Sequence, residues 1–420
     1  MIQVFSSAWA LLLGMGLLMI GNGMQSTLLG IRGAAESFST FEMSIVMSCY
    51  FVGFLGGSRM APGMIRRVGH VRVFAALASL ISAVMILYPT FPNVVLWSLG
   101  RVLIGFCFSA VYVTAESWLN NAADNSNRGQ ALSLYMIVQT FGIVIAQALL
   151  LIPDSSGFIL FVIPSILVSF AITPILLSIS PTPAFDTTKP MSLRQLGEFS
   201  PLGCVGMFLL GGIFAAQFGM ASVYGAEAGL SVAQISLYVA MFFLGAVILQ
   251  YPIGWISDRM DRRALIVIVA GIGAGGSILG MMLGQNYPVL LVSAFIMGGM
   301  SNPLYSLLIA HTNDFLEHDD MAAASGGLVF INGLGAILGP ILTGWIMGTA
   351  LGPPGFYLFT AVLFVLLVLY AAYRSTQRAT IAVEDTGEFV PIYPSATYQA
   401  VEYAQEYAIE TELEDEEESK

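Results

Sequence analysis

Residues 254–263 read Gly-Trp-Ile-Ser-Asp-Arg-Met-Asp-Arg-Arg and lie between two long apolar stretches of the chain. Residues 62–71 read Pro-Gly-Met-Ile-Arg-Arg-Val-Gly-His-Val, with Arg72 next, and lie between apolar stretches of the first half in the same way. About half of the chain separates the two basic stretches. A repeat of this kind in an apolar chain indicates two similar helical bundles that arose by duplication.

The composition indicates a membrane protein. Of the 420 residues, 57% are hydrophobic and 10% are charged, and the mean hydropathy is +0.81. About a quarter of the residues of a typical soluble domain are charged. Apolar runs long enough to cross ~30 Å of hydrocarbon recur along the whole chain. We therefore predict an all-α integral membrane protein with twelve transmembrane helices in two pseudo-symmetric six-helix bundles. The predicted spans are 5–27, 42–61, 71–90, 93–115, 131–152, 157–179, 202–224, 234–253, 264–285, 288–310, 323–348 and 354–374.

The distribution of cations predicts the orientation. With twelve helices, both termini lie on one side of the membrane. The cations expected on that side are Arg59, Arg66, Arg67, Arg72, Arg128, Lys189, Arg194, Arg259, Arg262, Arg263, Arg374 and Arg378. The opposite loops hold only Arg32. Because cytoplasmic loops carry an excess of Lys and Arg, we expect a multi-pass protein of the plasma (inner) membrane with both termini in the cytoplasm.

The chain divides into four regions. We expect an N-terminal six-helix bundle over residues 1–180, a cytoplasmic linker over 181–200, a C-terminal six-helix bundle over 201–375 and an acidic cytoplasmic tail over 376–420. Pro and Thr are enriched over residues 180–190, which predicts an extended linker that lets the bundles move relative to each other.

The tail carries the net charge of the chain. Twelve acidic residues from Glu384 onward, against Lys420 alone, account for the net charge of −11. This composition predicts disorder. Five residues are nevertheless spaced like one face of a short docking helix: Ala400, Tyr403, Ala404, Tyr407 and Ala408. Because the membrane-spanning part is close to neutral, the acidic pI of 4.7 says nothing about the charge of a substrate.

Small residues inside the spans are expected to pack helices against each other. Glycines at four-residue intervals allow close helix approach in lipid. Such glycines are Gly276, Gly280 and Gly284, and Gly335 and Gly339. The three cysteines (Cys49, Cys107 and Cys204) lie within spans and show no disulfide or metal-binding pattern.

Several stretches resemble signatures of the major facilitator superfamily. Gly254-x-x-x-Asp258-Arg259-x-x-Arg262-Arg263 is similar to the family's signature for the loop between helices 8 and 9. Arg101-Val102-Leu103-Ile104-Gly105 is similar to its Arg-x-x-x-Gly signature of helix 4. Further stretches resemble the YcaD-like bacterial branch: Glu116-Ser117, Asn127-Arg128-Gly129, Tyr251-Pro252-Ile253-Gly254, Glu317-His318 and Gly339-Pro340. The resemblance covers residues 5–375 and implies a secondary transporter, but no particular substrate.

The chain departs from the family pattern in two places. The signature of the loop between helices 2 and 3 has Arg66 where the family usually has Asp, and Pro62 at its opening Gly. Helix 5, with residues 139–144, lacks the Gly-Pro signature of many drug antiporters. The second departure weakens the interpretation as a multidrug exporter.

Arg101 is the most informative single residue. It lies about eight residues into its helix, so roughly 12 Å deep at 1.5 Å per residue. A charge inside the membrane costs at least ~2.5–3.5 kcal/mol and normally faces a cavity or a partner. Tyr112 and Glu116 follow on nearly the same helix face, but Glu116 is about 22 Å further along and cannot pair with Arg101. Arg101 therefore acts either in coupling or substrate orientation, or as a structural bond between helices.

Other polar residues at mid-membrane depth complete a candidate substrate pathway. They are Asn22, Gln25, Gln139, Gln217, Tyr224, Asn302, Tyr305 and Asn332, in addition to Arg101, Tyr112 and Glu116. Transporter sites lie near the midplane between the two halves. For each single residue, a hydrogen bond that joins two helices is an equally good explanation. As a set, amide and phenol groups with one cation suit a small neutral or anionic solute.

The coupling mechanism is left open by the sequence. No carboxylate lies deep in helix 1 or helix 7. Glu116 is the best candidate for a group that binds and releases a proton, because partial burial disfavours a charged carboxylate. The alternative is an uncoupled facilitative uniporter without a titrating site.

Charged residues at the predicted cytoplasmic ends are expected to form a gate. The candidate gate residues are Arg66, Arg67, Arg72, Arg128, Asp258, Arg259, Arg262, Arg263, Glu317, Asp319 and Asp320. The basic loop 2–3 is complementary to the acidic loop 10–11, where Asp314 adds to these acids, and Asp258 of loop 8–9 is complementary to Arg128 of loop 4–5. We expect these contacts to form when the inner side closes. The alternative is that they are ordinary loop charges that set the topology.

The function classes can be ranked from these features. A monomeric secondary transporter of a small molecule, working by alternating access in the lipid bilayer and with or without protons, comes first. An enzyme is disfavoured, because His70, His311 and His318 lie at loop edges without metal spacing or a paired nucleophile. We expect no cofactor, no metal and no nucleic acid partner. A membrane-embedded ligand sensor with a signalling acidic tail is the second class.

Overall fold

The computed structural model describes residues 2–122, 128–154, 157–177, 191–316, 318–377, 389–392, 397, 399–401 and 404. These residues form helices joined by short connections, and none of them is in a strand. Twelve helical segments of the described part are long and apolar enough to cross a membrane. The predicted all-α fold with twelve transmembrane helices is confirmed.

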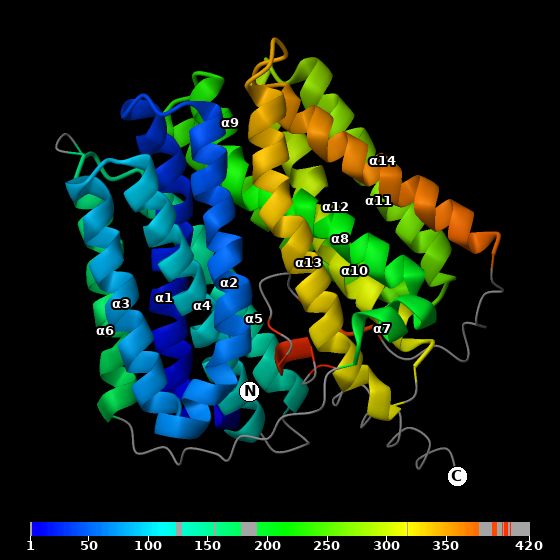
Figure 1. Cartoon of the computed structure of the whole chain (residues 1–420), viewed down its shortest axis with the longest axis horizontal. Helices are drawn as coiled ribbons and strands as arrows, with labels where there is room; N and C mark the ends of the chain where they lie inside the picture. Colours follow the sequence, from blue (N-terminus) through cyan, green and yellow to red (C-terminus); the bar gives the residue numbers. More distant parts are fainter. Residues whose placement is uncertain are drawn as a thin grey trace. The chain divides into compact units, whose positions relative to one another are not determined.

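The first compact unit contains residues 1–187 and 218–240. Its helices are α1 (Ile2–Ala35), α2 (Thr40–Val68), α3 (His70–Thr90), α4 (Val94–Ala122), α5 (Arg128–Leu149), α6 (Ile159–Leu177), α9 (Ala221–Glu227) and the start of α10 (Val232–Ser257). Helix α1 packs against α5 and α6, α2 packs against α4, and α3 packs against α4 and α6 (Figure 1).

The second compact unit contains residues 188–217 and 241–420. Its helices are α7 (Leu193–Phe199), α8 (Pro201–Ala215), the rest of α10, α11 (Arg262–Leu283), α12 (Tyr287–Asn313), α13 (His318–Met347) and α14 (Gly355–Ser375). Helix α8 packs most extensively against α13, and α11 packs against α12 and α14.

The same type of close helix contact occurs in both units. A Cβ atom at Gly53 of α2 would lie 1.9 Å from the Val102 carbonyl oxygen of α4, so only glycine fits there. In unit 2, a Cβ atom at Gly245 of α10 would lie 2.0 Å from the Phe295 carbonyl oxygen of α12. Small residues permit such backbone approach between helices in lipid. The repeat seen in the sequence therefore corresponds to a repeated packing contact.

The glycines at four-residue intervals in the second half also pack helices closely. A Cβ atom at Gly335 of α13 would lie 1.9 Å from the Phe208 carbonyl oxygen of α8. At Gly280 of α11, a Cβ atom would lie 2.3 Å from a ring carbon of Tyr357 in α14. The packing role predicted for Gly276, Gly280, Gly335 and Gly339 is confirmed.

Several helices differ from their predicted spans, since α1 ends at Ala35 and α2 at Val68, beyond the predicted ends at 27 and 61. Helix α4 ends at Ala122, seven residues beyond the predicted end at 115, because helical hydrogen bonding continues through the polar residues that follow the apolar run. The predicted span 202–224 is interrupted by a π-helix, η2 (Ala216–Met220), between α8 and α9. Short π-helical segments are frequent at functional sites.

The linker region contains a short helix. Helix α7 lies within the predicted linker 181–200, and Ser192 caps it by accepting a hydrogen bond of 3.3 Å from the backbone N–H of Gln195. The Pro- and Thr-rich part of the linker, from residue 180 to 190, lies outside the described residues.

A buried ion pair joins α11 to the end of α12. Arg262 and Asp314 form this pair, with side-chain exposures of 3% and 4%. Arg262 Nη1 also donates a 3.3 Å hydrogen bond to the Ala310 carbonyl oxygen, and its Nε donates a 3.4 Å bond to Ser257 Oγ. Removing one member of such a pair leaves a buried charge without compensation.

The ion pair gives a first prediction. Arg262→Ala should lower the free energy of unfolding by about 3–5 kcal/mol, because Asp314 would stay buried and charged. The double variant Arg262→Met with Asp314→Leu should recover most of this loss. Thermal unfolding of the purified protein in detergent measures both. The exposed pair of Arg194 and Glu198 is the control, since Arg194→Ala should cost no more than ~1 kcal/mol. Equal losses in the single and double variants would contradict the prediction.

Candidate functional site

Four residues that the sequence singled out form a chain of hydrogen bonds between α1 and α4. Arg101 is buried, with 2% of its surface exposed, and its Nη1 donates a 2.9 Å hydrogen bond to Gln25 Oε1. Gln25 Nε2 donates to Asn22 Oδ1 at 3.2 Å. Asn22 Nδ2 donates to the Tyr112 hydroxyl at 3.0 Å. We call these residues (Arg101, Gln25, Asn22 and Tyr112) the Arg101 network.

Tyr50 of α2 completes the surroundings of the guanidinium. The Cζ atom of Arg101 lies 4.7 Å from the centre of the Tyr50 ring, a distance at which the ring attracts a cation. Sequence reasoning missed Tyr50, because a tyrosine within an apolar run usually serves packing. A usable signal was its position three residues before Gly53, since both residues lie where α2 contacts α4 closely.

The charge of Arg101 is not neutralised by a carboxylate. Among the described residues, no Asp or Glu oxygen lies within 4.0 Å of Arg101. Its Nε atom is buried and has no hydrogen-bond partner. A buried cation of this kind is costly in a membrane and normally marks a pathway for a solute or an ion. The arrangement leaves a donor that a ligand with acceptor atoms can use.

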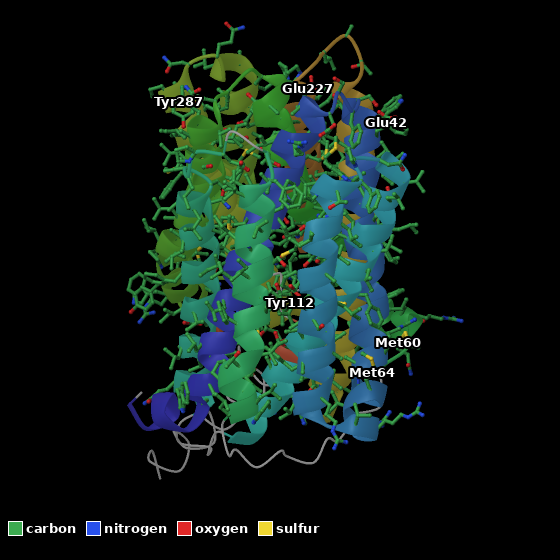
Figure 2. All side chains as sticks on the ribbon, turned by 90° about the vertical axis from the view of Figure 1, so that its left-hand side faces the viewer. Glu42, Met60, Met64, Tyr112, Glu227 and Tyr287 are labelled. Carbon is green, nitrogen blue, oxygen red and sulfur yellow. The ribbon has the colours of Figure 1, made fainter. Side chains whose placement is uncertain are left out.

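The network lies well inside unit 1. Figure 2 shows Tyr112 between the end of the unit that carries Glu42 and Glu227 and the opposite end that carries Met60 and Met64. This depth corresponds to the middle part of the membrane-spanning helices, where transporters bind their substrates.

Glu116 belongs to a second polar cluster of unit 1. The Tyr135 hydroxyl donates a 3.2 Å hydrogen bond to Glu116 Oε1, and Glu116 is 1% exposed. Helix α4 continues past Glu116 to Ala122. The adjacent Ser117 Oγ lies 3.2 Å from His70 Nε2, and His70, the first residue of α3, is buried.

The candidate residues of unit 2 bond mainly to nearby helices. Gln217, in the π-helix, accepts a 2.9 Å hydrogen bond from Ser301 Oγ, and its Nε2 is buried without a partner. Asn302 Nδ2 donates to the Gly298 carbonyl oxygen at 3.2 Å. Asn332 Nδ2 donates to the Met207 carbonyl oxygen at 3.0 Å, and it joins α13 to α8. The bonds of Asn302 and Asn332 are those of structural residues.

The remaining pathway candidates have mixed surroundings. The rings of Tyr224 and Tyr238 lie 5.6 Å apart in unit 1, and the rings of Tyr305 and Phe214 lie 6.2 Å apart in unit 2. Gln217 lies in the π-helix that precedes Tyr224, so regular α-helical spacing does not relate the positions of these two side chains. Gln139 is buried in α5.

One polar contact of unit 1 was missed by the sequence reasoning. Gln147 of α5 accepts a 3.3 Å hydrogen bond from Thr27 Oγ1 and donates a 3.4 Å bond to the Gly23 carbonyl oxygen. These bonds tie α5 to the part of α1 that carries Asn22 and Gln25. The sequence did contain a signal for Gln147, because an amide side chain within an apolar run usually has a polar partner.

The gate candidates fall into several groups. Arg66, Arg67 and Arg72 are exposed, and Asp320 is half-buried. Arg262 pairs with Asp314 inside unit 2.

Aromatic contacts hold two other cations of unit 2. Arg259 lies 4.2 Å from the Trp255 ring, and Arg263 lies 5.7 Å from the Phe315 ring. Asp258 accepts a hydrogen bond from the tail. The side chains of Arg128 and Asp319, and the whole of Glu317, lie outside the described residues.

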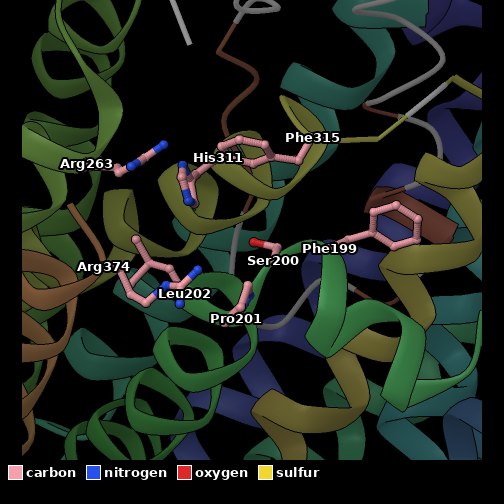
Figure 3. Close-up of a pocket in the computed structure, with 8 residues that line it drawn as sticks. All are labelled: Phe199, Ser200, Pro201, Leu202, Arg263, His311, Phe315 and Arg374. Atoms are coloured by element: carbon pink, nitrogen blue, oxygen red, sulfur yellow. The ribbon is translucent and has the colours of Figure 1, made fainter. Parts of the chain in front are cut away.

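A basic cavity in unit 2 is too small to be a substrate site. Arg263, His311 and Arg374 line it together with Ser200, which precedes α8 (Figure 3). Its volume is about 10 Å³, which corresponds to about one water molecule. A larger groove of about 440 Å³ in unit 1 has an almost entirely apolar lining, which includes the exposed residues Leu87 and Leu99. Neither cavity contains a residue of the Arg101 network.

Comparison with known sequences identifies the family. The sequence model of the Major Facilitator Superfamily matches residues 11–225 and 202–394. The uncharacterized MFS-type transporter YcaD of Salmonella arizonae is 25% identical over 367 residues, which are 86% of this chain and 94% of that protein. The YcaD of Escherichia coli O7:K1 is 26% identical over the same length, with the same shares of both chains covered.

Comparison with solved structures supports the same fold. The crystal structure of the nucleoside transporter NupG has a TM-score of 0.72 at 14% identity, and the match covers 87% of this chain and 99% of NupG. An inward-facing, occupied structure of a bacterial homolog of the human lysosomal transporter Spinster has a TM-score of 0.71 at 15% identity, over 90% of this chain and 97% of that one. At these identities the likeness concerns the fold alone. The chain thus belongs to the major facilitator superfamily, resembles its YcaD proteins, and is a multi-pass membrane transporter rather than an enzyme.

Proposed function

We propose that the protein is a secondary transporter that moves a small solute across the bacterial inner membrane by alternating access, as a monomer with both termini in the cytoplasm. The duplicated basic stretches and the duplicated glycine contacts support two halves that move as units. The excess of cations on one predicted side supports the orientation.

The Arg101 network is the proposed solute site of unit 1. The observation that carries this proposal is the buried guanidinium without a carboxylate partner, whose Nε–H has no acceptor. Arg101 supplies the donor of the network, and Tyr50 supplies an aromatic face. Hydrogen bonds from a charged donor are worth about 1.5–3 kcal/mol each. We therefore propose a small solute rich in acceptor oxygens, such as a carboxylate or a polyhydroxylated neutral molecule.

The role of Arg101 can be tested before the solute is known. A panel of small carboxylates and polyols should contain compounds that raise the melting temperature of the purified protein, because ligands that bind the native state stabilise it. Arg101→Ala should weaken binding of these compounds about 10- to 100-fold, the loss of one charge-assisted hydrogen bond. Arg101→Lys should recover little of this, because an ammonium does not reproduce the planar guanidinium.

The control separates a site residue from a structural one. Arg194→Ala, which removes an exposed cation, should leave the stabilisation by each compound unchanged. The same compounds should drive flux in proteoliposomes of the parent protein and not of Arg101→Ala. Undiminished stabilisation and flux in a correctly inserted Arg101→Ala protein would refute the proposed site. Binding without any flux in the parent would favour a ligand sensor.

We further propose that Glu116 is the proton-binding group of a coupled mechanism. Its carboxylate is buried and accepts a hydrogen bond from the Tyr135 hydroxyl. A change of its protonation would therefore alter the hydrogen bonding inside unit 1. Glu116→Gln should make flux insensitive to a protonophore, because an amide cannot titrate. Tyr135→Phe, which removes the donor but keeps the carboxylate, should retain the sensitivity. If a protonophore leaves the flux of the parent unchanged, the transporter is an uncoupled uniporter.

The exposed gate residues are proposed to control the conformation of the transporter. We propose that Arg66, Arg67 and Arg72 of the first half and the acids around Asp320 of the second half stabilise the state in which the inner side is closed. Exposed pairs are worth only about 0–1 kcal/mol each, but several together shift a near-even equilibrium. Arg67→Glu should therefore populate the inward-open state, and additional Asp319→Lys and Asp320→Lys changes should partly reverse the shift. Spin-label distances across the inner face would report both, and identical distances in all variants would exclude the gate.

A further inference from the structure

A short segment of the acidic tail is bound to unit 2. The backbone N–H of Phe389 donates a 2.9 Å hydrogen bond to Asp258 Oδ1, in the connection that follows α10. Ile392 exchanges two hydrogen bonds with Ser306 of α12: its N–H donates to Oγ at 2.8 Å, and its carbonyl oxygen accepts from Oγ at 3.1 Å. Residues 389–392 are thus held at both ends.

The tail completes the hydrogen bonding of Ser306. A serine hydroxyl has one hydrogen to donate and two acceptor positions. Gln250 Nε2 of α10 donates to Ser306 Oγ at 3.0 Å and fills one acceptor position. Ile392 uses the other acceptor position and the hydrogen. Ser306 is 1% exposed, so without the tail its hydroxyl would lose two of its three partners.

Side-chain packing adds to these hydrogen bonds. The Phe389 ring lies against Gly254, where a Cβ atom would come within 2.5 Å of a ring carbon. Ile392 is 4% exposed. The side chain of a larger residue at position 254 would therefore displace the ring. Gly254 and Asp258 belong to the basic stretch that opened the sequence analysis.

The following part of the tail is buried as well. Residues 399–401 are helical, and the N–H of Val401 donates to the Thr397 carbonyl oxygen at 3.2 Å. Thr397, Ala400, Val401 and Ala404 are almost completely buried. Ala400 and Ala404 are two of the five residues whose spacing predicted a short docking helix.

We propose that the end of unit 2 that carries Asp258 is a binding site for residues 389–392 of the chain's own tail, and that this strap holds the transporter in one conformational state until it detaches. The strap bonds to Asp258, after α10, and to Ser306 of α12, so a conformational change that moves these two attachment points apart has to release it. The proposal rests on the alternating access proposed above, whereas the binding of the strap can be measured without any solute.

Cysteine accessibility tests whether the strap is bound and can detach. In a protein without Cys49, Cys107 and Cys204, Ile392→Cys should react slowly with N-ethylmaleimide, because the strap buries it. Adding Gly254→Leu or Phe389→Ala should raise the rate about tenfold or more, because each change removes the packing of the Phe389 ring against Gly254; a tenfold change corresponds to about 1.4 kcal/mol. Gly271→Leu is the matched control, because a Cβ there would meet no atom within 4 Å. Equal rates in the parent and in both displaced variants would overturn the proposed binding site.

Distance measurements test whether the strap controls the conformation. Spin labels at Val68→Cys and Met321→Cys should give a distance distribution that changes when Phe389→Ala is added, with no solute present. The distribution in the Gly271→Leu control should match that of the parent. Release of the strap without a change in the distribution would make it a passive brace and overturn the proposal. If the distribution changes but neither the parent nor the released protein shows flux, the proposed transport function is contradicted. Control of the conformation by the strap would still be supported.

Discussion

The buried charge of Arg101 is the constraint on which the interior of unit 1 depends. A guanidinium among apolar helices has to be solvated by the protein itself, and here no carboxylate does so within the described residues. The side-chain amide oxygen of Gln25 (Oε1) and the face of the Tyr50 ring solvate the guanidinium. Gln25 in turn fixes Asn22, which fixes the Tyr112 hydroxyl. These polar residues of α1 and α4 are therefore connected by hydrogen bonds into one network. A solute that bonds to Arg101 would affect the hydrogen bonds of the whole network.

This arrangement needs helices that lie very close together. The ring of Tyr50 reaches the guanidinium because α2 and α4 touch through their backbones at Gly53 and Gly105, where any Cβ atom would overlap a carbonyl oxygen. Unit 2 repeats the contact between α10 and α12, but the residue of α12 that corresponds to Arg101 is Ala294, directly before Phe295. Duplication thus preserved the packing, while the chemistry of the two halves diverged.

Much of the fold and of the Arg101 network could be predicted from the sequence. The same physical reasons explain which features could not be predicted. Arg101, Gln25 and Asn22 stand out because polar groups in an apolar run are costly, and the twelve spans follow from the length of the runs. Tyr50 could not be recognised, since a tyrosine in such a run is also an ordinary packing residue. The end of α4 and the π-helix depend on backbone hydrogen bonds that hydropathy does not report. The bound part of the tail was hidden because the acidic residues around it dominate the composition, although Phe389 and Ile392 are apolar.

The tail also explains one departure of the repeat. In the second basic stretch, Gly254 leaves room for the Phe389 ring and Asp258 accepts its N–H. The corresponding residues of the first stretch are Pro62 and Arg66. A proline ring would fill the space of the phenyl ring, and a guanidinium donates hydrogen bonds but cannot accept one. The first half is therefore unable to bind the same segment, and the difference between the two basic stretches selects the second half as the place where the tail attaches.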